Sequence, residues 1–206
     1  MRRAGYLDSL VPMASATLSA PILIDVPEVF HTERLTIRPH RPGDGPAVFA
    51  AVHESLAELR QFPASLGWAL AEPSIEASEQ YCREAHAKFL TRCDLPLLLL
   101  LRGSNTVVAS SGLHRIDWSV PKFEVGFWGR TSFQRTGYVT EGVSTIVAMA
   151  FDRLKARRVE ALPDDLNERS CRVCERLGFE LEGTLRHERV DPNGSLRNMR
   201  VYARVR

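Results

Sequence analysis

The segment from Phe123 to Glu141 constrains the fold of this chain most, because a strand pattern there runs through a glycine-containing loop into a long helix. Residues 123–128 read as a strand, and apolar residues then recur with the helical period from about Gly137 to Leu154. The first-turn N–H groups of such a helix lack intrahelical partners, and with the helix dipole they form an anion site. The segment therefore predicts a phosphate-binding turn. A simple strand–helix turn is the alternative.

The other elements surround this unit without a regular βαβ repeat. Asp44, Ser74 and Asn167 are expected N-caps of three further helices. The run Leu97–Leu101 suits a strand that is buried on both faces. The expected strands cover residues 34–38, 97–101, 107–116, 123–128 and 159–162 and a final hairpin turned at 191–194. This order predicts a mixed α/β (α+β) fold, with a mostly antiparallel sheet of about seven strands flanked by helices.

Length and composition indicate a single globular domain. The chain has 206 residues, of which 44% are apolar and 25% charged. A net charge of +2 gives no field that would attract nucleic acid or an anionic membrane. No segment approaches the ~20 apolar residues that a membrane span needs. We expect a domain over residues 31–206, an N-terminal tail over 1–30 that can dock on it, a cytoplasmic location, and a monomer or homodimer without nucleic-acid or membrane partners.

The four cysteines are Cys82, Cys93, Cys171 and Cys174. The Cys-x-x-Cys pair raises the question of zinc or redox chemistry, but zinc needs two further ligands, and the other two cysteines lack matching tight spacing. The pair also falls inside an expected helix among core-facing residues. We interpret the thiols as buried small hydrophobes and expect no metal site.

Several motifs resemble the GNAT superfamily of N-acetyltransferases. Its motif A, Q/R-x-x-G-x-G/A, is matched by Gln134, Gly137 and Val139. The preceding E-V-G-F-W is similar to the E-I-G-Y-W strand of the RimJ/RimL-like branch, the ribosomal-protein alanine N-acetyltransferase-like enzymes. N-E-R-S-C-R-V-C-E-R-L-G-F at 167–179 resembles that branch's N-x-x-S-x-R-V-x-E-K-L-G-F, and T-E-R-L at 32–35 matches its opening. The matches extend over about residues 31–206 in the correct order.

The resemblance implies the GNAT fold, with a V-shaped split between the strands at 123–128 and 159–162. It also implies acetyl-CoA as co-substrate in that split, and direct attack of a primary amine on the acetyl carbonyl without a covalent enzyme intermediate. Asn167 and Ser170 would lie near the thioester. The cofactor-binding residues that it implies, pantetheine first and pyrophosphate second, are Phe127, Trp128 and Gly129, then Gln134, Arg135, Thr136, Gly137, Tyr138, Val139 and Thr140.

The general acid is not carried over by the resemblance. Many GNAT enzymes place an acid Tyr four residues before the Gly that closes the last helix, and Cys174 occupies that position here. Ser170 is therefore the first candidate to protonate the CoA thiolate, directly or through water. The alternative is that Ser170 is a first-turn serine that only bonds to Asn167.

Candidate bases lie on the central strands. Glu124 is the first, and His114 is a second that we interpret primarily as a sheet histidine packed near Trp118. Glu188 is discounted because it is one residue out of register with a Glu of related enzymes, and a shift of one reverses the face of a strand. The sequence displays no paired carboxylates and no His–carboxylate pair. An α-amine with pKa ~8 loses its proton at pH 7 for about 1.4 kcal/mol, against about 4.6 kcal/mol for a lysine amine, so we expect an α-amine or another weakly basic amine.

The leading function is therefore acetyl transfer to a primary amine, with a protein N-terminus as one acceptor. The first alternative is a small amine, such as an antibiotic or a metabolite. A second is a CoA-binding module with little catalysis, suggested by departures from the family pattern at Arg135, Val139, Pro163 and Cys174. The arginines of the final hairpin form either a solvated strand face or an electropositive rim for an acidic acceptor.

Overall fold

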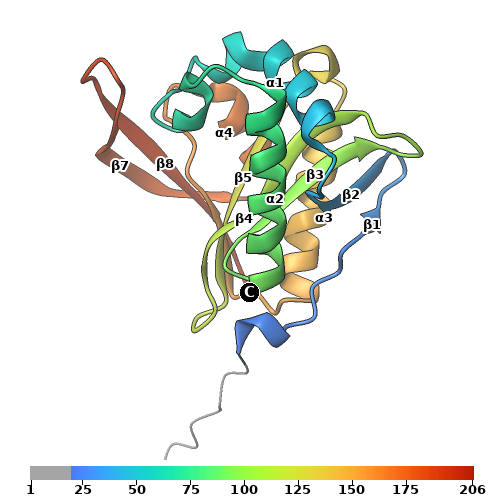
Figure 1. The fold of residues 1–206 in the computed structure, drawn as a ribbon. Coiled ribbons are helices and arrows are strands. Elements are labelled where there is room, and N and C mark those ends of the chain that lie inside the picture. Colours follow the sequence, from blue (N-terminus) through green and yellow to red (C-terminus); the bar gives the residue numbers. More distant parts are fainter. Residues whose placement is uncertain (1–19) are drawn as a thin grey trace, which may run out of the picture.

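The computed structural model describes residues 20–206, whose strands form one sheet in the order β1-β2-β3-β4-β5-β6-β8-β7 (Figure 1). All neighbouring strands are antiparallel except β5 and β6, which are parallel. The mixed, mostly antiparallel sheet is thus confirmed, with eight strands instead of about seven. The additional strand, β1, has two residues, too few for an alternating pattern. The strands are β1 Phe30–His31, β2 Leu35–Pro39, β3 Leu95–Leu101, β4 Val107–Asp117, β5 Lys122–Gly129, β6 Arg158–Ala161, β7 Glu180–Val190 and β8 Leu196–Val205.

Helices cover both faces of the sheet. On one face lie α1 (Gly45–Leu59) and α2 (Ile75–Thr91), and on the other lie α3 (Tyr138–Asp152) and α4 (Glu168–Arg176) (Figure 1). The leucine run of β3 explains this arrangement, because successive strand residues point to opposite faces. Leu97 and Leu99 join the core under α3, whereas Leu98 and Leu100 pack under α1. Short 3-10 helices occur at Pro21–Leu23, Gly67–Leu70 and Thr131–Phe133.

Two of the three expected caps are confirmed. The side chain of Ser74 accepts a hydrogen bond from the N–H of Ala77, and that of Asn167 from the N–H of Ser170. The expectation for Asp44 is wrong, since its carboxylate makes no cap bond to α1. Arg38 binds both oxygens of that carboxylate, at 2.6 and 2.8 Å, because an ionised partner outcompetes a neutral N–H donor.

The described part of the expected N-terminal tail is docked. Val26 is buried, and the carbonyl of Ile24 accepts a hydrogen bond from Arg92. Residues 1–19 of the expected tail lie outside the described residues. Within residues 20–206, no helix is both long and apolar enough to cross a membrane.

Candidate functional site: a split sheet beside a cavity

The sheet opens between β5 and β6. These strands pair only from Lys122–Glu124 to Arg158–Glu160, and β5 then continues to Gly129 with β4 alone on its other side. After Ala161, the chain turns toward β8, where the carbonyl of Pro163 accepts the N–H of Arg200. The V-shaped split is therefore present, and the backbone of β5 beyond Glu124 has no strand partner inside it.

A narrow slit of about 120 Å³ occupies this split. Glu124, Phe127, Asn167 and Ser170 all line it, so four residues predicted from separate parts of the sequence lie around one space. The side chain of Asn167 accepts the N–H of Ser170 at 3.1 Å, so the backbone of Ser170 completes a helix cap. The hydroxyl of Ser170 makes no hydrogen bond to the described residues and is available to a ligand in the slit.

The turn into α3 exposes a run of backbone donors. None of the N–H groups from Arg135 to Thr140 has a hydrogen-bond partner within residues 20–206. Two residues of the turn adopt left-handed backbone conformations, Arg135 at φ 60° and Gly137 at φ 85°. Left-handed residues beside helical ones direct successive N–H groups into a shared concavity that favours anions. The turn does not line the slit. It lies after β5, at the start of α3.

The T-E-R-L segment at 32–35 holds this turn in place. The guanidinium of Arg34 donates to the carbonyl of Thr136 at 2.9 Å and to the carboxylate of Glu141 at 2.6 Å. The hydroxyl of Thr32 donates to the same carboxylate, in the first turn of α3. Burial alone would raise the pKa of Glu141, but the hydrogen bonds from Thr32 and Arg34 outweigh it and hold this pKa below its usual range. An ionised Glu141 thus anchors this turn to the segment that leads into β2.

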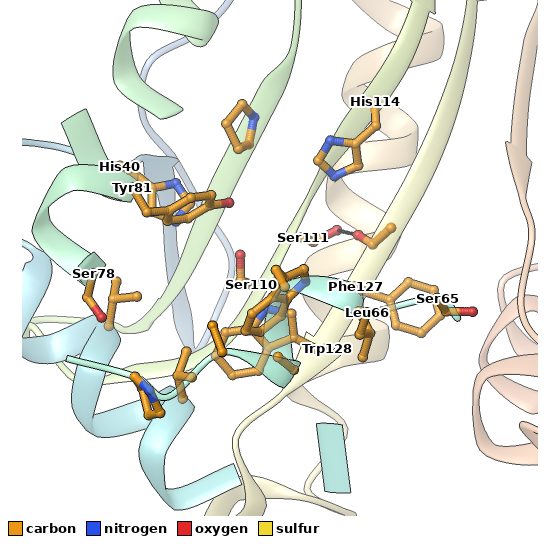
Figure 2. Close-up of a pocket in the computed structure, with 18 of the residues that line it drawn as sticks. His40, Ser65, Leu66, Ser78, Tyr81, Ser110, Ser111, His114, Phe127 and Trp128 are labelled. Carbon is orange, nitrogen blue, oxygen red and sulfur yellow. Dashed lines mark hydrogen bonds between the residues drawn. The ribbon is translucent and has the colours of Figure 1, made fainter. Parts of the chain in front are cut away.

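A larger cavity of about 630 Å³ lies between the sheet and the α1–α2 side (Figure 2). Its apolar wall includes Trp68 and Trp128, whose ring centroids are 6.1 Å apart. Tyr81 and His114 approach the same space from α2 and β4 (Figure 2). The residues that line both this cavity and the slit are Ser65, Leu66, Glu124, Gly126, Phe127 and Arg189, so the two spaces adjoin.

His114 and Asp94 form a pair at the cavity wall. The Nδ1 atom of His114 lies 2.7 Å from a carboxylate oxygen of Asp94, whereas the ring of Trp118 packs against Phe123. The expectation that the chain lacks a His–carboxylate pair is therefore wrong. The two residues are 20 positions apart and belong to different strands and loops, so only the sheet brings them together.

The other candidate bases differ in availability. Glu124 faces the cavity opposite His114 in the strand register, but its carboxylate binds the guanidinium of Arg115. Glu188 is exposed on β7 and lines neither space, whereas its neighbour Arg189 lines both. The register argument that discounted Glu188 agrees with this placement.

His40 is a buried polar residue that sequence reasoning missed. Its side chain lines the cavity with both ring nitrogens unpartnered among the described residues, and only 1% of its surface is exposed. Burial lowers the pKa of His40 to about 4, so its ring is neutral at pH 7. No signal in the sequence distinguishes this histidine, because its burial depends on packing against Tyr81, at 5.1 Å between ring centroids.

The thiols lie as expected in the interior, except for Cys93, which is exposed. Burial raises the pKa values of the Cys82 and Cys174 thiols to about 12, so neither is a thiolate at neutral pH. Among residues 20–206, no group of three or more His, Cys, Asp or Glu side chains could hold a metal ion. Cys174 lines the slit as a neutral thiol in the place of the missing tyrosine.

The arginines of the final hairpin do not act as one surface. Arg197 binds both oxygens of the buried Asp164, at 2.6 and 2.9 Å. Arg204 and Arg206 lie over the ring of Phe151, near the opposite end of β8. An electropositive rim would consist of Arg186, Arg189 and Arg200, which form no ion pair within the described residues.

Comparison with known proteins agrees with this geometry. An acetyltransferase (GNAT) domain model matches residues 34–180. Two relatives come from Bacillus subtilis (strain 168). YoaA, an uncharacterized N-acetyltransferase, is 24% identical over 86% of this chain and 97% of its own. YdaF, provisionally named a ribosomal N-acetyltransferase, is 35% identical over 74 residues, 36% of this chain, and the matched part spans only 40% of YdaF.

Solved structures share the fold. RimL, a ribosomal L7/L12 alpha-N-protein acetyltransferase in complex with coenzyme A, superposes with a TM-score of 0.78 at 21% identity, covering 86% of this chain and 98% of RimL. MccE, a microcin C7 self immunity acetyltransferase in complex with acetyl-CoA and AMP, superposes with a TM-score of 0.75 at 16% identity, covering 85% and 94% of the two chains. Because the domain model matches most of the chain, this protein belongs to the GNAT family of N-acetyltransferases.

Proposed function

We propose that this enzyme transfers the acetyl group of acetyl-CoA to a primary amine by direct attack, with the α-amine of a protein N-terminus as the acceptor. The observation that supports this most is the junction of the two spaces at Glu124, Gly126 and Phe127. A thioester in the slit and an amine in the cavity would meet there. Both structural neighbours named above bind a form of CoA, and RimL acts on a protein α-amine by name.

The proposed cofactor path follows the unpaired backbone. Pantetheine would run along β5 at Phe127, Trp128 and Gly129, as a strand substitute beyond the last β5–β6 pair. The pyrophosphate would sit on the N–H groups of residues 135–140, where a helix N-terminus favours negative charge. Gln134 begins this turn, and its side-chain oxygen accepts a hydrogen bond from the guanidinium of Arg169.

Ser170 is proposed as the group that protonates the departing CoA thiolate. The amine nitrogen forms a bond to the acetyl carbon, the carbon–sulfur bond breaks, and the thiolate takes a proton to become the CoA thiol. Ser170 lines the slit with a free hydroxyl, whereas Cys174 is a buried thiol with a pKa of about 12. Glu124, paired with Arg115, stands where it can bind the incoming amine.

A small amine is the alternative acceptor, favoured by the cavity itself. Its volume of about 630 Å³ and its Trp68–Trp128 wall suit a compact aromatic ligand. MccE shows that this fold also serves a self-immunity acetyltransferase. Both acceptors require the same acyl donor and the same slit.

The test is CoA release from acetyl-CoA with three acceptors: a peptide with a free N-terminal Ser or Ala, the same peptide with a blocked N-terminus and an internal Lys, and phenylethylamine. The proposal expects transfer to the free α-amine only. Preferential transfer to phenylethylamine would promote the small-amine alternative. Binding of acetyl-CoA without transfer to any acceptor would instead indicate a CoA-binding module.

A further inference from the structure

We propose that His114 is the general base of the transfer and that Asp94 is its positioning residue, a role that rests on the proposed function. The pair has a defined proton arrangement. Asp94 accepts at 2.7 Å from Nδ1, so Nδ1 carries the proton of the neutral ring and Nε2 keeps a lone pair. Within residues 20–206, Nε2 makes no hydrogen bond and is left to a ligand in the cavity.

Two glycines make room for this ring. Gly112 on β4 and Gly126 on β5 are direct cross-strand partners on the face that carries His114. A Cβ at Gly112 would lie 2.8 Å from Cε1 of His114, and a Cβ at Gly126 would lie 3.2 Å from its Cδ2. The imidazole therefore packs against the backbone of the two glycines, and a side chain at either position would displace it.

This position lies beside the junction where the reacting groups would meet. Gly126 lines both the slit and the cavity, and a Cβ on it would lie 3.4 Å from Nε2 of His114. Glu124, the other carboxylate there, is bound by Arg115. Arg115 has a left-handed backbone at φ 46° within an irregular stretch of β4 between His114 and Asp117, and irregular strands re-aim side chains next to sites. The carboxylate of Glu124 is thus already ion-paired, whereas Nε2 of His114 has no hydrogen-bond partner among residues 20–206.

The step balances as a single proton transfer. The amine, already neutral, attacks the thioester carbonyl, and the proton that its nitrogen sheds as the C–N bond forms passes to Nε2 of His114. Asp94 then faces an imidazolium that it stabilises by charge. The other titratable or charged groups that line this cavity are Glu124 and Arg115 from the central strands, Tyr81 from α2, His40 after β2, Glu72 before α2 and Arg189 from β7.

The experiment compares His114→Gln and Asp94→Asn with His53→Gln, a matched histidine substitution on the exposed face of α1 outside the cavity. Acceptors are the free Ser or Ala peptide and phenylethylamine, with acetyl-CoA as donor. We expect His114→Gln to lower kcat about 100-fold or more, the usual effect of losing a general base, while KM and acetyl-CoA affinity stay unchanged. Asp94→Asn, whose amide oxygen still accepts from Nδ1, should lower kcat about 10-fold.

Two further measurements separate a base from a structural histidine. The wild-type kcat/KM should fall in acid as Nε2 is protonated, and His114→Gln should lose this acid limb. Free imidazole should restore part of the rate of His114→Ala, since the space above Gly112 and Gly126 would be vacated. A His114→Gln enzyme with normal kcat and an intact acid limb would overturn the base role alone. A wild-type enzyme that binds acetyl-CoA but acetylates no acceptor would overturn the proposed function and the base role together.

Discussion

The turn before α3 offers a sharp test of phosphate binding through Gly137. Its φ of 85° belongs to the left-handed region, which glycine enters freely and which Asn and Asp tolerate better than other side chains. Gly137→Asn and Gly137→Asp therefore impose nearly the same shape and backbone cost. They differ in one negative charge, placed at the mouth of the N–H groups of residues 135–140.

The expected magnitude follows from Coulomb's law. A carboxylate roughly 6–8 Å from one phosphate charge costs about 1.0–1.4 kcal/mol at an effective dielectric near 40, which is about 5- to 10-fold in Kd. Arg34 offsets this repulsion only in part. Its Nη2 would lie 3.4 Å from the new Cβ, but its guanidinium already binds the carboxylate of Glu141 and the carbonyl of Thr136. We expect Gly137→Asp to bind CoA more weakly than Gly137→Asn by this factor.

Calorimetric titration of both variants with CoA measures the difference. The internal control is acetyl-pantetheine as acyl donor, which lacks the pyrophosphate, so the two variants should use it at equal rates. Equal CoA affinities of folded Gly137→Asp and Gly137→Asn would refute phosphate binding at this turn. A difference that persists with acetyl-pantetheine would show that the charge acts on the enzyme and not on the phosphate.

Three other predictions address the slit, the turn and the cavity. Ser170→Ala should lower turnover about 100-fold with unchanged acetyl-CoA affinity, whereas Cys174→Ala should change turnover little; near-normal turnover of Ser170→Ala would leave Ser170 only its place beside the helix cap. Arg135→Gly should raise the free energy of unfolding by about 1 kcal/mol, because Arg135 holds a left-handed φ of 60°, and urea denaturation at unchanged m-value would measure this gain. Since the pKa of His40 is about 4 when folded and 6.5 when unfolded, the unfolded state binds its proton first as pH falls, and stability should drop by up to about 3 kcal/mol between pH 6.5 and pH 4. This drop should be smaller in His40→Gln and unchanged in His53→Gln, and equal slopes in all three proteins would contradict a buried neutral His40.

The turn and the helix cap on the proposed cofactor side were predictable because their information is local. The turn is encoded within consecutive residues, as a strand, Gly137 and a helical pattern, and the cap at Asn167 precedes its helix directly. Within residues 20–206, the one strand missed, β1, is too short for periodicity to detect. The failed cap at Asp44 had a non-local cause, since Arg38 reaches that carboxylate from β2.

The cavity side depends instead on distant pairs. Asp94 meets His114 only because β3 pairs with β4, and the glycines beneath the ring meet only because β4 pairs with β5. Neither contact corresponds to a fixed spacing between residues in the sequence. A glycine within a strand pattern nevertheless signals close approach by another group. Two of them at cross-strand positions, beside a histidine on the same face, would have indicated the space for a ring once the hairpin register was known.

The same contrast explains how one fold can change acceptors while it keeps its donor. The proposed donor contacts are backbone groups of β5 and of the turn at 135–140, whose geometry is fixed by the sheet and by the clamp from Arg34 to Glu141. Substitutions of surface side chains leave such contacts largely intact, which fits the replacement of the commoner Gly-Lys by Arg135-Thr136 in this turn. The cavity, by contrast, is built from side chains of α1, α2, the loop carrying Trp68 and the central strands. Those side chains that do not also line the slit, such as Trp68 and Tyr81, can be replaced without disturbing it. Under the proposed function, we therefore expect the choice of amine to be set on the α1–α2 side of the sheet, where His114, His40 and the Trp68–Trp128 wall line the cavity.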